Sequence, residues 1–323
     1  MGITAKVKGE VVGTGDVTVP FRQIYKVVKK LPAGEFEIKQ DGHTLRIISG
    51  KMKYGLEIMD AKEFPEIPVS KKKAIFTITG ECLKALLRKT VFAVSDDPTR
   101  FVLSGIRVEL CKGHIQIVAT DGSRMVVFKN SSKAYSYKQE KKMAFILPGS
   151  AVRSLIKMVD IYGGTVSFVP GETEKDLFFS TGDTIVKAIA IEGNYPTYAG
   201  IVKDVEKNKL QISLHRAVLI EAIKSVAVGD VHGSGCKFTF DKGTLVLSTK
   251  SSDMGEISNE IDVEYKGSLT VGYNYQYVLQ ALDTLDTEHV TFHIKDSFTG
   301  LLITGYENKE NIKHVVMPFK VDK

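Results

Sequence analysis

The 323-residue sequence predicts an α+β protein built from repeated units, each a helix followed by short antiparallel strands. Two patterns support this class. Apolar residues at helical spacing alternate with short strand-like runs, and the same order of elements recurs along the chain. The length exceeds what one hydrophobic core usually organises, so we expect more than one domain.

One kind of segment occurs three times, beginning near Asp16, Met143 and Gly267. Each copy opens with a strand, continues as an amphipathic helix and then gives three short strands. The opening strand ends at Pro20, Pro148 and Gly272 in the three copies. A repeated strand–helix–strand order of this kind predicts that each copy is half of a larger domain.

A second kind of segment occurs twice, beginning near Phe76 and Leu210. Each copy gives a strand, a helix and then a paired-strand pattern. Lys112-Gly113 and Lys242-Gly243 stand between the paired strands, where a tight hairpin turn favours glycine.

The two kinds of segment combine into domains, each a first half followed by a second half. We predict a middle domain over residues 70–202 and a last domain over 203–323, joined by polar, lysine-rich linkers. Residues 1–69 read as a second half without its first half, which is a truncated first domain.

Composition and motifs exclude several classes of function. Cys82, Cys111 and Cys236 are scattered, which argues against disulfide staples and a zinc site. No apolar run approaches the ~18 residues that cross a bilayer, and the N-terminus lacks a signal-peptide core, so we expect a cytoplasmic protein. We found no catalytic, P-loop or dinucleotide motif, and we expect neither enzymatic activity nor a cofactor.

Four stretches together carry a resemblance to a known family: "FAVSDDPTRFVLSGIRVEL" from Phe92, "IVATDGSRM" from Ile117, "EGNYPTYAGIV" from Glu192 and "HVVMPFKV" from His314. They resemble the bacterial DNA polymerase III beta subunit, the sliding clamp, along essentially the whole chain. This family forms a ring of two head-to-tail subunits, each with three similar domains, that encircles duplex DNA and tethers polymerases. In the family the first domain is complete, and we therefore interpret Met1 as an internal methionine.

The resemblance and the repeated basic helices predict a surface that binds DNA without sequence preference, through phosphates. Lysines on the polar face of a helix are usually only solvated, which is the alternative. For Arg100 the alternative is an ion pair with Asp96 or Asp97, and for Tyr273 a place in the core. The candidate DNA-binding residues are Arg22, Lys26, Lys84, Arg88, Arg100, Arg153, Lys157 and Tyr273. Further basic residues stand at Lys29, Lys30, Lys89, Arg216 and Lys224.

The resemblance also implies a mostly apolar cleft that takes a short peptide of the polymerase alpha subunit, the clamp loader or another partner. Met adapts its shape to several ligands, and Arg124 could orient the peptide. The alternatives are an ordinary turn at Thr120–Gly122 and an ordinary C-terminal edge strand. The cleft residues carried over are Leu103, Thr120, Gly122, Ser123, Arg124, Met125, Gly300, Val315, Val316, Met317, Pro318 and Phe319.

Ring closure in the family joins the first domain of one subunit to the last domain of the other. Tyr54 and Leu56 match the first side of that contact and Val228 the second. Two rival functions remain: a protein-binding module that cannot encircle DNA, and a metal-dependent enzyme acting on nucleic acid. A nuclease assay separates the enzyme from the others, and we expect no activity.

Overall fold

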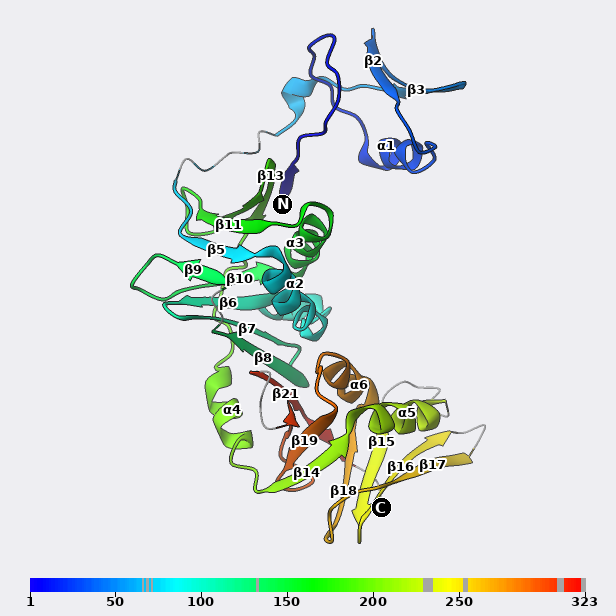
Figure 1. Cartoon of the computed structure of the whole chain (residues 1–323), viewed down its shortest axis with the longest axis vertical. Coiled ribbons are helices and arrows are strands. Elements are labelled where there is room, and N and C mark those ends of the chain that lie inside the picture. Colours follow the sequence, from blue (N-terminus) through cyan, green and yellow to red (C-terminus); the bar gives the residue numbers. More distant parts are fainter. Residues whose placement is uncertain are drawn as a thin grey trace. The chain divides into compact units, whose positions relative to one another are not determined.

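A computed structural model describes residues 1–65, 67, 70, 72–131, 134–228, 235–251, 255–306 and 311–320 (Figure 1). Contacts within the chain divide it into two compact units, residues 5–68 and residues 1–4 with 69–323. No helix in the described part is both long and apolar enough to cross a membrane.

The smaller unit is one helix over a three-stranded antiparallel sheet. Its elements are α1 (Phe21–Val28), β2 (Glu37–Asp41), β3 (Thr44–Ser49), β4 (Met52–Glu57) and the 3-10 helix η1 (Ala61–Glu63). Its buried core is small: Val27, Leu45, Ile47 and Leu56. Leu45 and Ile47 alternate with exposed Arg46, as a sheet with one covered face requires. The predicted helix followed by three strands is confirmed here.

The first part of the larger unit contains both kinds of repeat. Its first half comprises β5 (Phe76–Thr79), α2 (Gly80–Arg88), η2 (Val91–Ala93), η3 (Pro98–Ser104), β6 (Gly105–Cys111), β7 (His114–Thr120), β8 (Arg124–Asn130) and β9 (Tyr135–Tyr137). Its second half comprises β10 (Met143–Pro148), α3 (Gly149–Tyr162), β11 (Thr165–Pro170), β12 (Asp176–Thr181) and β13 (Thr184–Ile189). The first residues of the chain form β1 (Gly2–Thr4), which pairs with β13 and so joins this sheet.

The last part repeats the same order after a connecting helix, α4 (Tyr198–Val205). It comprises β14 (Leu210–His215), α5 (Arg216–Ala227), β15 (Cys236–Asp241), β16 (Thr244–Ser251), β17 (Gly255–Asp262), β18 (Ser268–Tyr273), α6 (Tyr275–Asp283), β19 (His289–Ile294), β20 (Leu301–Gly305), β21 (Ile312–Val316) and β22 (Pro318–Phe319). Both predicted hairpin turns are present: Gly113 has a φ of 89° and Gly243 one of 100°, which glycine adopts without strain.

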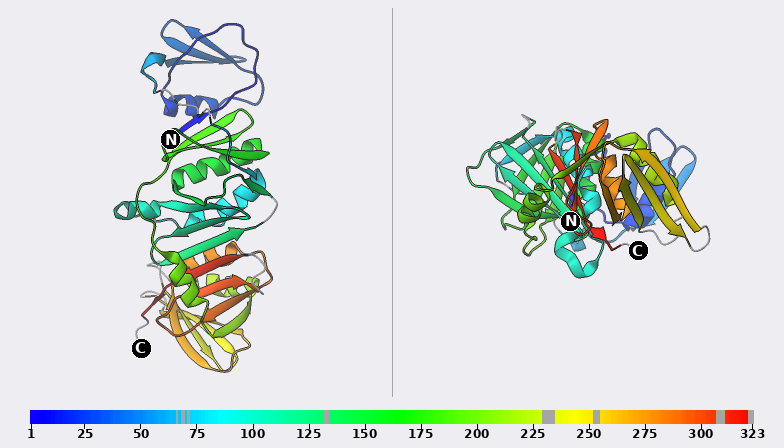
Figure 2. Two further views of the ribbon diagram at one scale, coloured as in Figure 1. Left: turned by 90° about the vertical axis from the view of Figure 1, so that its left-hand side faces the viewer. Right: turned by 90° about the horizontal axis from the view of Figure 1, so that it is seen from below.

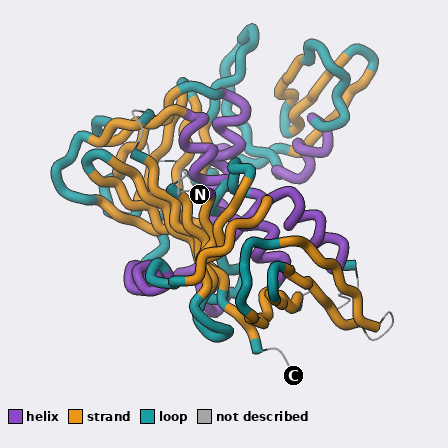
Figure 3. Tube along the Cα trace, turned by 60° about the horizontal axis from the view of Figure 1, so that its bottom comes forward, coloured by secondary structure: helices purple, strands orange, loops and turns teal. Residues whose placement is uncertain are grey.

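An eight-stranded antiparallel sheet joins the first and last parts of the larger unit, in the order β10-β6-β7-β8-β21-β20-β19-β14. At its centre β8 pairs with β21, with Met125 opposite Val315 and Arg124 opposite Val316. Figure 3 shows the strands side by side with helices beside them. A six-stranded sheet and a five-stranded sheet complete the unit, in the orders β1-β13-β12-β11-β5-β9 and β17-β16-β15-β18-β22.

The two faces of the eight-stranded sheet are covered by different elements. Along β8, Val126 and Phe128 face the main core, which also contains buried residues of α2, α3, α5 and α6. Met125 and Val127 face a second apolar cluster with Val202 of α4. Alternation along a strand therefore separates a face covered by the repeat helices from a face crossed by α4 (Figures 1 and 2).

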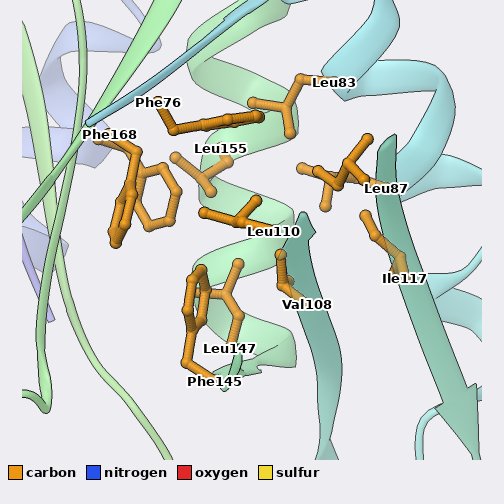
Figure 4. A pocket seen from close by; sticks show the side chains of 12 residues that line it. Phe76, Leu83, Leu87, Val108, Leu110, Ile117, Phe145, Leu147, Leu155 and Phe168 are labelled. Carbon is orange, nitrogen blue, oxygen red and sulfur yellow. The ribbon is translucent and has the colours of Figure 1, made fainter. Parts of the chain in front are cut away.

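Figure 4 shows a cavity inside the main core, between α2, α3 and the strands around them. Its volume is about 20 Å³, and its lining side chains, among them Leu83, Val108 and Phe168, are all apolar. A cavity of this size holds at most about one water, which would find no polar partner there. It is a packing gap in the core and has no features of a ligand site.

Candidate nucleic-acid interface and partner cleft

Two adjacent helices of the middle domain carry the strongest group of predicted DNA contacts. On α3, Arg153 and Lys157 are exposed and one helical turn apart. They form no ion pair within the described residues. The Nζ of Lys84 lies 2.6 Å from Asp160 Oδ1, and Arg88 Nη2 lies 2.7 Å from Asp160 Oδ2.

Asp160 offsets part of this positive charge. The hydrogen bond from Lys84, with the charge of Arg88, lowers the pKa of the Asp160 carboxyl, which therefore stays ionised at neutral pH. The cations Lys84, Arg88, Arg153 and Lys157 outnumber the carboxylates Glu81 and Asp160 of these two helices, so the pair presents net positive charge to an approaching phosphate backbone. Lys84 and Arg88 are partly neutralised, whereas Arg153 and Lys157 are available.

The remaining basic helices differ in whether their cationic side chains face solvent. In the smaller unit, Arg22 and Lys26 on α1 are exposed, as predicted for a polar face. On α5, Arg216 donates hydrogen bonds to the carbonyls of Thr287 (3.1 Å) and Leu282 (3.3 Å), so its guanidinium fastens the end of α6 to α5. Basic residues on the repeat helices therefore do not all face solvent.

Tyr273 lies in the core and not at a surface. Its side chain has 0% exposure and packs edge-to-face against Phe238, with ring centroids 5.4 Å apart. Burial raises the pKa of its hydroxyl, which has no hydrogen-bond partner within the described residues. A side chain without exposed area cannot contact a phosphate, so the core alternative is the correct one for this residue. The alternation of β18, which buries Tyr273 and Val271, is the sequence signal for it.

Arg100 lies beside the predicted cleft. Its Nη1 donates to the carbonyl of Asp121 at 2.9 Å, and its Nε lies 3.7 Å from Asp97 Oδ2, the ion pair kept as the alternative. Its guanidinium also lies against Gly122, because a Cβ on Gly122 would be 2.7 Å from Arg100 Nη1. Gly122 has a φ of 94°, so the turn needs glycine for both its backbone and its close contact with Arg100.

The turn between β7 and β8 is held by its own side chains. Asp121 Oδ1 accepts hydrogen bonds from the amides of Ser123 (2.9 Å) and Arg124 (3.0 Å). Thr120 Oγ1 donates to the carbonyl of Arg124 at 2.6 Å and accepts from the amide of Gly122 at 3.1 Å. Thr120–Gly122 therefore forms a turn, as the alternative interpretation expected, and side-chain hydrogen bonds hold its exposed backbone in place.

The C-terminal strand brings its apolar side chains to this turn. The amide of Met317 donates to the carbonyl of Ser123 at 2.9 Å. Gly300 lies against Val315 and Met317, since a Cβ on it would be 3.1 Å and 3.3 Å from their side chains. Met125 and Val315 are buried in the second cluster with Leu103 at its edge, while 44% of Met317 is exposed.

Val316 faces away from the predicted cleft, and the chain then continues into the short strand of Pro318 and Phe319. Val316 belongs to the main core on the opposite face, so only its backbone lies at the cleft. Pro318 and Phe319 pair with β18 of the five-stranded sheet, and the Phe319 ring lies beside Gly235. The structure therefore gathers Leu103, Met125, Gly300, Val315 and Met317 beside the turn.

Arg124 fastens the cleft turn to the last domain. Its side chain is 11% exposed; Nε donates to Asp121 (3.0 Å) and Nη2 to the carbonyl of Phe92 (2.7 Å). Nη1 donates to Gln280 of α6, and the guanidinium lies 4.2 Å from the centroid of the Tyr277 ring. Its guanidinium donors therefore have partners inside the chain, and its role in orienting a bound peptide stays a prediction.

A second contact set supports the same junction. His314 of β21 stacks on Phe92, and its Nε2 lies 2.8 Å from Thr284 Oγ1. Complete burial, with Lys89 and Arg124 nearby, lowers the pKa of His314 to about 3, so this imidazole is neutral. No short-range pattern predicts Tyr277 or Gln280 as partners of Arg124, because these contacts join residues about 150 positions apart in the chain.

The predicted ring-contact residues differ in exposure. Val228 follows α5 and is 71% exposed, and Tyr54 is half-buried. Leu56 is buried in the small core with Val27 and Leu45, so little of it is left for another subunit. Among the residues that the structure describes, no cluster of His, Cys, Asp and Glu could hold a metal ion.

The chain combines duplicated helix-and-sheet halves with a continuous sheet. Basic helices lie on one face of this sheet and an apolar C-terminal cleft on the other, which is the arrangement of the sliding-clamp class of protein. Family models of the DNA polymerase III beta subunit match the chain in order: the N-terminal domain at residues 1–68, the central domain at 77–197 and the C-terminal domain at 205–320. The chain belongs to the DNA polymerase III beta subunit family.

Individual relatives agree with this assignment. The chain is 28% identical to the beta sliding clamp of Chlamydia muridarum over 98% of its own length and 84% of the relative's. Among solved structures, the beta subunit of Thermotoga maritima superposes with a TM-score of 0.89 at 25% identity, covering 99% of this chain and 86% of that one. That of Pseudomonas aeruginosa gives 0.85 at 25% identity, covering 97% and 85%.

Proposed function

We propose that this chain is a DNA sliding clamp, a non-enzymatic subunit that encircles duplex DNA and tethers replication proteins to it. Besides the family, one observation carries the proposal. The available cations Arg153 and Lys157 lie on the helix side of the eight-stranded sheet, opposite the cleft that would hold a partner. A tether needs these two surfaces to act at once without interfering.

The proposed DNA contacts are weak and independent of sequence. The basic residues proposed to contact phosphates are Arg22, Lys26, Lys84, Arg88, Arg153 and Lys157, and Arg100 beside the cleft turn is proposed as a separate contact. Phosphate contacts of this kind release counterions, so affinity for linear DNA falls steeply as salt rises. Closure into a ring would hold DNA topologically, so that retention on a circle does not depend on the strength of each contact.

We propose that ring closure joins two copies head to tail, with Tyr54 and Leu56 on one copy and Val228 on the other. The partners proposed for the cleft are the alpha subunit of DNA polymerase III, the clamp loader and other proteins with a short apolar clamp-binding segment. We propose that the protein works in the cytoplasm, where the bacterial chromosome is replicated.

Retention on circular DNA tests the proposal. The protein is incubated with nicked circular DNA and a clamp loader, passed over a sizing column in high salt, and compared with the same DNA cut once. We expect protein to remain with the circle and to be lost from the linear form. Equal loss from both forms would contradict encirclement.

A protein-binding module that does not encircle DNA is the second candidate, and the smaller unit favours it. Among its described residues, four apolar side chains are buried in its core, while Phe21 and Tyr25 on α1 are 75% and 54% exposed. Light scattering on a size-exclusion column separates the candidates. A mass of about twice the 35.6 kDa chain supports the ring, whereas a monomer supports the module.

A further inference from the structure

A second hollow lies beside α4 on the sheet face away from the repeat helices. Its volume is about 360 Å³. Its floor comes from β7, β8 and β21, and its wall is the stripe of α4 that carries Tyr198, Val202 and Glu206. These residues are four apart and therefore share one side of the helix. We call this hollow the α4 groove.

The α4 groove is separate from the partner cleft. Both use β8 and β21, but they use different residues of each strand. On β8 the cleft residue Met125 comes before the groove residue Lys129, and on β21 the cleft residue Val315 comes after the groove residue Lys313. Lys129 stands four residues beyond Met125 on the same face of β8, about 13 Å further along the strand. The second apolar cluster fills the space between, with Val127 and Val202 also forming the apolar part of the groove.

The groove carries an excess of positive charge. Lys129, Lys203 and Lys313 line it together with one carboxylate, Glu206, which lies 2.5 Å from the Nζ of Lys313. Lys129 and Lys203 form no ion pair with the residues that the structure describes. The neighbouring lysines of the same sheet do: Lys112 pairs with Glu140 at 2.7 Å and Lys142 with Glu109 at 2.6 Å.

The lysine charges also affect the pKa of the nearby His114. Burial lowers the pKa of its imidazole first, and the positive charges of Lys129 and Lys142 lower it further. Lys129 and Lys142 therefore add positive potential at His114, while the carboxylate of Glu109 opposes them.

The rest of the lining suits an acidic side chain better than a bare ion. Gln116 Nε2 donates to the hydroxyl of Tyr198 at 2.5 Å, which leaves a polar edge opposite the apolar Val127 and Val202. The methylenes of a glutamate can lie on the valines while its carboxylate reaches a lysine.

We propose that the α4 groove binds a short acidic segment of a protein partner. The inference rests on the proposed function, because a DNA tether would hold its protein partners on the sheet face opposite α2 and α3. Duplex DNA is the less suitable occupant, since the groove lies on the face opposite α2 and α3 and is lined by a carboxylate as well as by lysines.

The test uses a fluorescently labelled tetraglutamate peptide and the full-length chain. Fluorescence anisotropy is measured for the wild type, for Lys129→Glu/Lys203→Glu, and for Lys112→Glu/Lys141→Glu, a control that reverses two exposed charges outside the groove. We expect Lys129→Glu/Lys203→Glu to bind at least about tenfold more weakly and the control to lose about twofold or less. Unchanged thermal unfolding shows that both variants are folded.

Three outcomes would overturn the proposal. An equal loss in the Lys112→Glu/Lys141→Glu control would mean non-specific charge attraction, and no loss in Lys129→Glu/Lys203→Glu would mean that the peptide binds elsewhere. Displacement of the peptide by inorganic phosphate or by duplex DNA at similar concentrations would assign the groove to a small anion or to nucleic acid. Retention of Lys129→Glu/Lys203→Glu on circular DNA is scored separately, so failure of encirclement is distinguishable from failure of the groove.

Discussion

The helices α1 and α3 occupy the same position of the same repeat, yet they are buried very differently. Both follow a proline, Pro20 and Pro148, and precede three strands. On α3 the buried residues are Gly149, Ala151, Val152, Leu155, Met158 and Val159, whereas on α1 only Val27 is buried among the described residues. The helix α2 from the first half of the domain packs against α3. A second half therefore buries its helix fully only when a first-half helix lies beside it.

The largest effect expected from this comparison is on stability. Leu155→Ala should destabilise the larger unit by about 2–5 kcal/mol, because it opens a cavity in a fully buried site. Val27→Ala removes less volume from a site with fewer neighbours and should cost clearly less. Urea denaturation of the two variants gives the comparison. Equal losses would show that α1 is packed as tightly as α3.

A smaller effect is expected at the junction of the two halves of the larger unit. Arg124→Lys should destabilise the chain by about 1–3 kcal/mol, since lysine keeps the charge but cannot reach Asp121, Gln280 and the Phe92 carbonyl together. Thermal unfolding measures the loss. Arg153→Lys, on the exposed face of α3, is the control and should be nearly neutral. Full stability of Arg124→Lys would mean that the junction does not depend on this guanidinium.

A smaller effect again is expected on the binding of a partner peptide in the cleft. Removing residues 315–323 would abolish partner binding, but Val315 and Val316 are also buried in the two clusters that join the halves. Met317→Ala is therefore the sharper test, because 44% of Met317 is exposed beside Gly300.

We expect this variant to bind a clamp-binding peptide of the polymerase alpha subunit about five- to tenfold more weakly, as for a side chain at the centre of a small interface. Fluorescence anisotropy is the measurement. Ile161→Ala, an exposed apolar residue at the end of α3, is the control. Unchanged peptide affinity in Met317→Ala would refute this assignment of the cleft.

The sequence predicted the repeats well because they depend on local patterns. Helical spacing, alternation and the glycines at 113 and 243 are all visible within a short window. The site was predicted less completely because its geometry depends on pairing between distant strands. That Tyr273 is buried, that Val316 faces the main core and that Arg124 meets Gln280 all follow from how β18, β21 and α6 pack. None of these contacts leaves a short-range signal.

The smallest expected effect concerns DNA and compares two lysines on adjacent helices. Lys157 has no ion pair within the described residues, whereas Lys84 lies 2.6 Å from Asp160. Lys157→Ala should therefore weaken linear-duplex binding and reduce the slope of log affinity against log salt by about 0.9, the value for one phosphate contact. Lys84→Ala should change the slope less, because the charge of Lys84 is already partly neutralised by its ion pair with Asp160. Anisotropy titrations at several salt concentrations measure both slopes. A larger change for Lys84 than for Lys157 would mean that the DNA-facing side of this helix pair lies on α2.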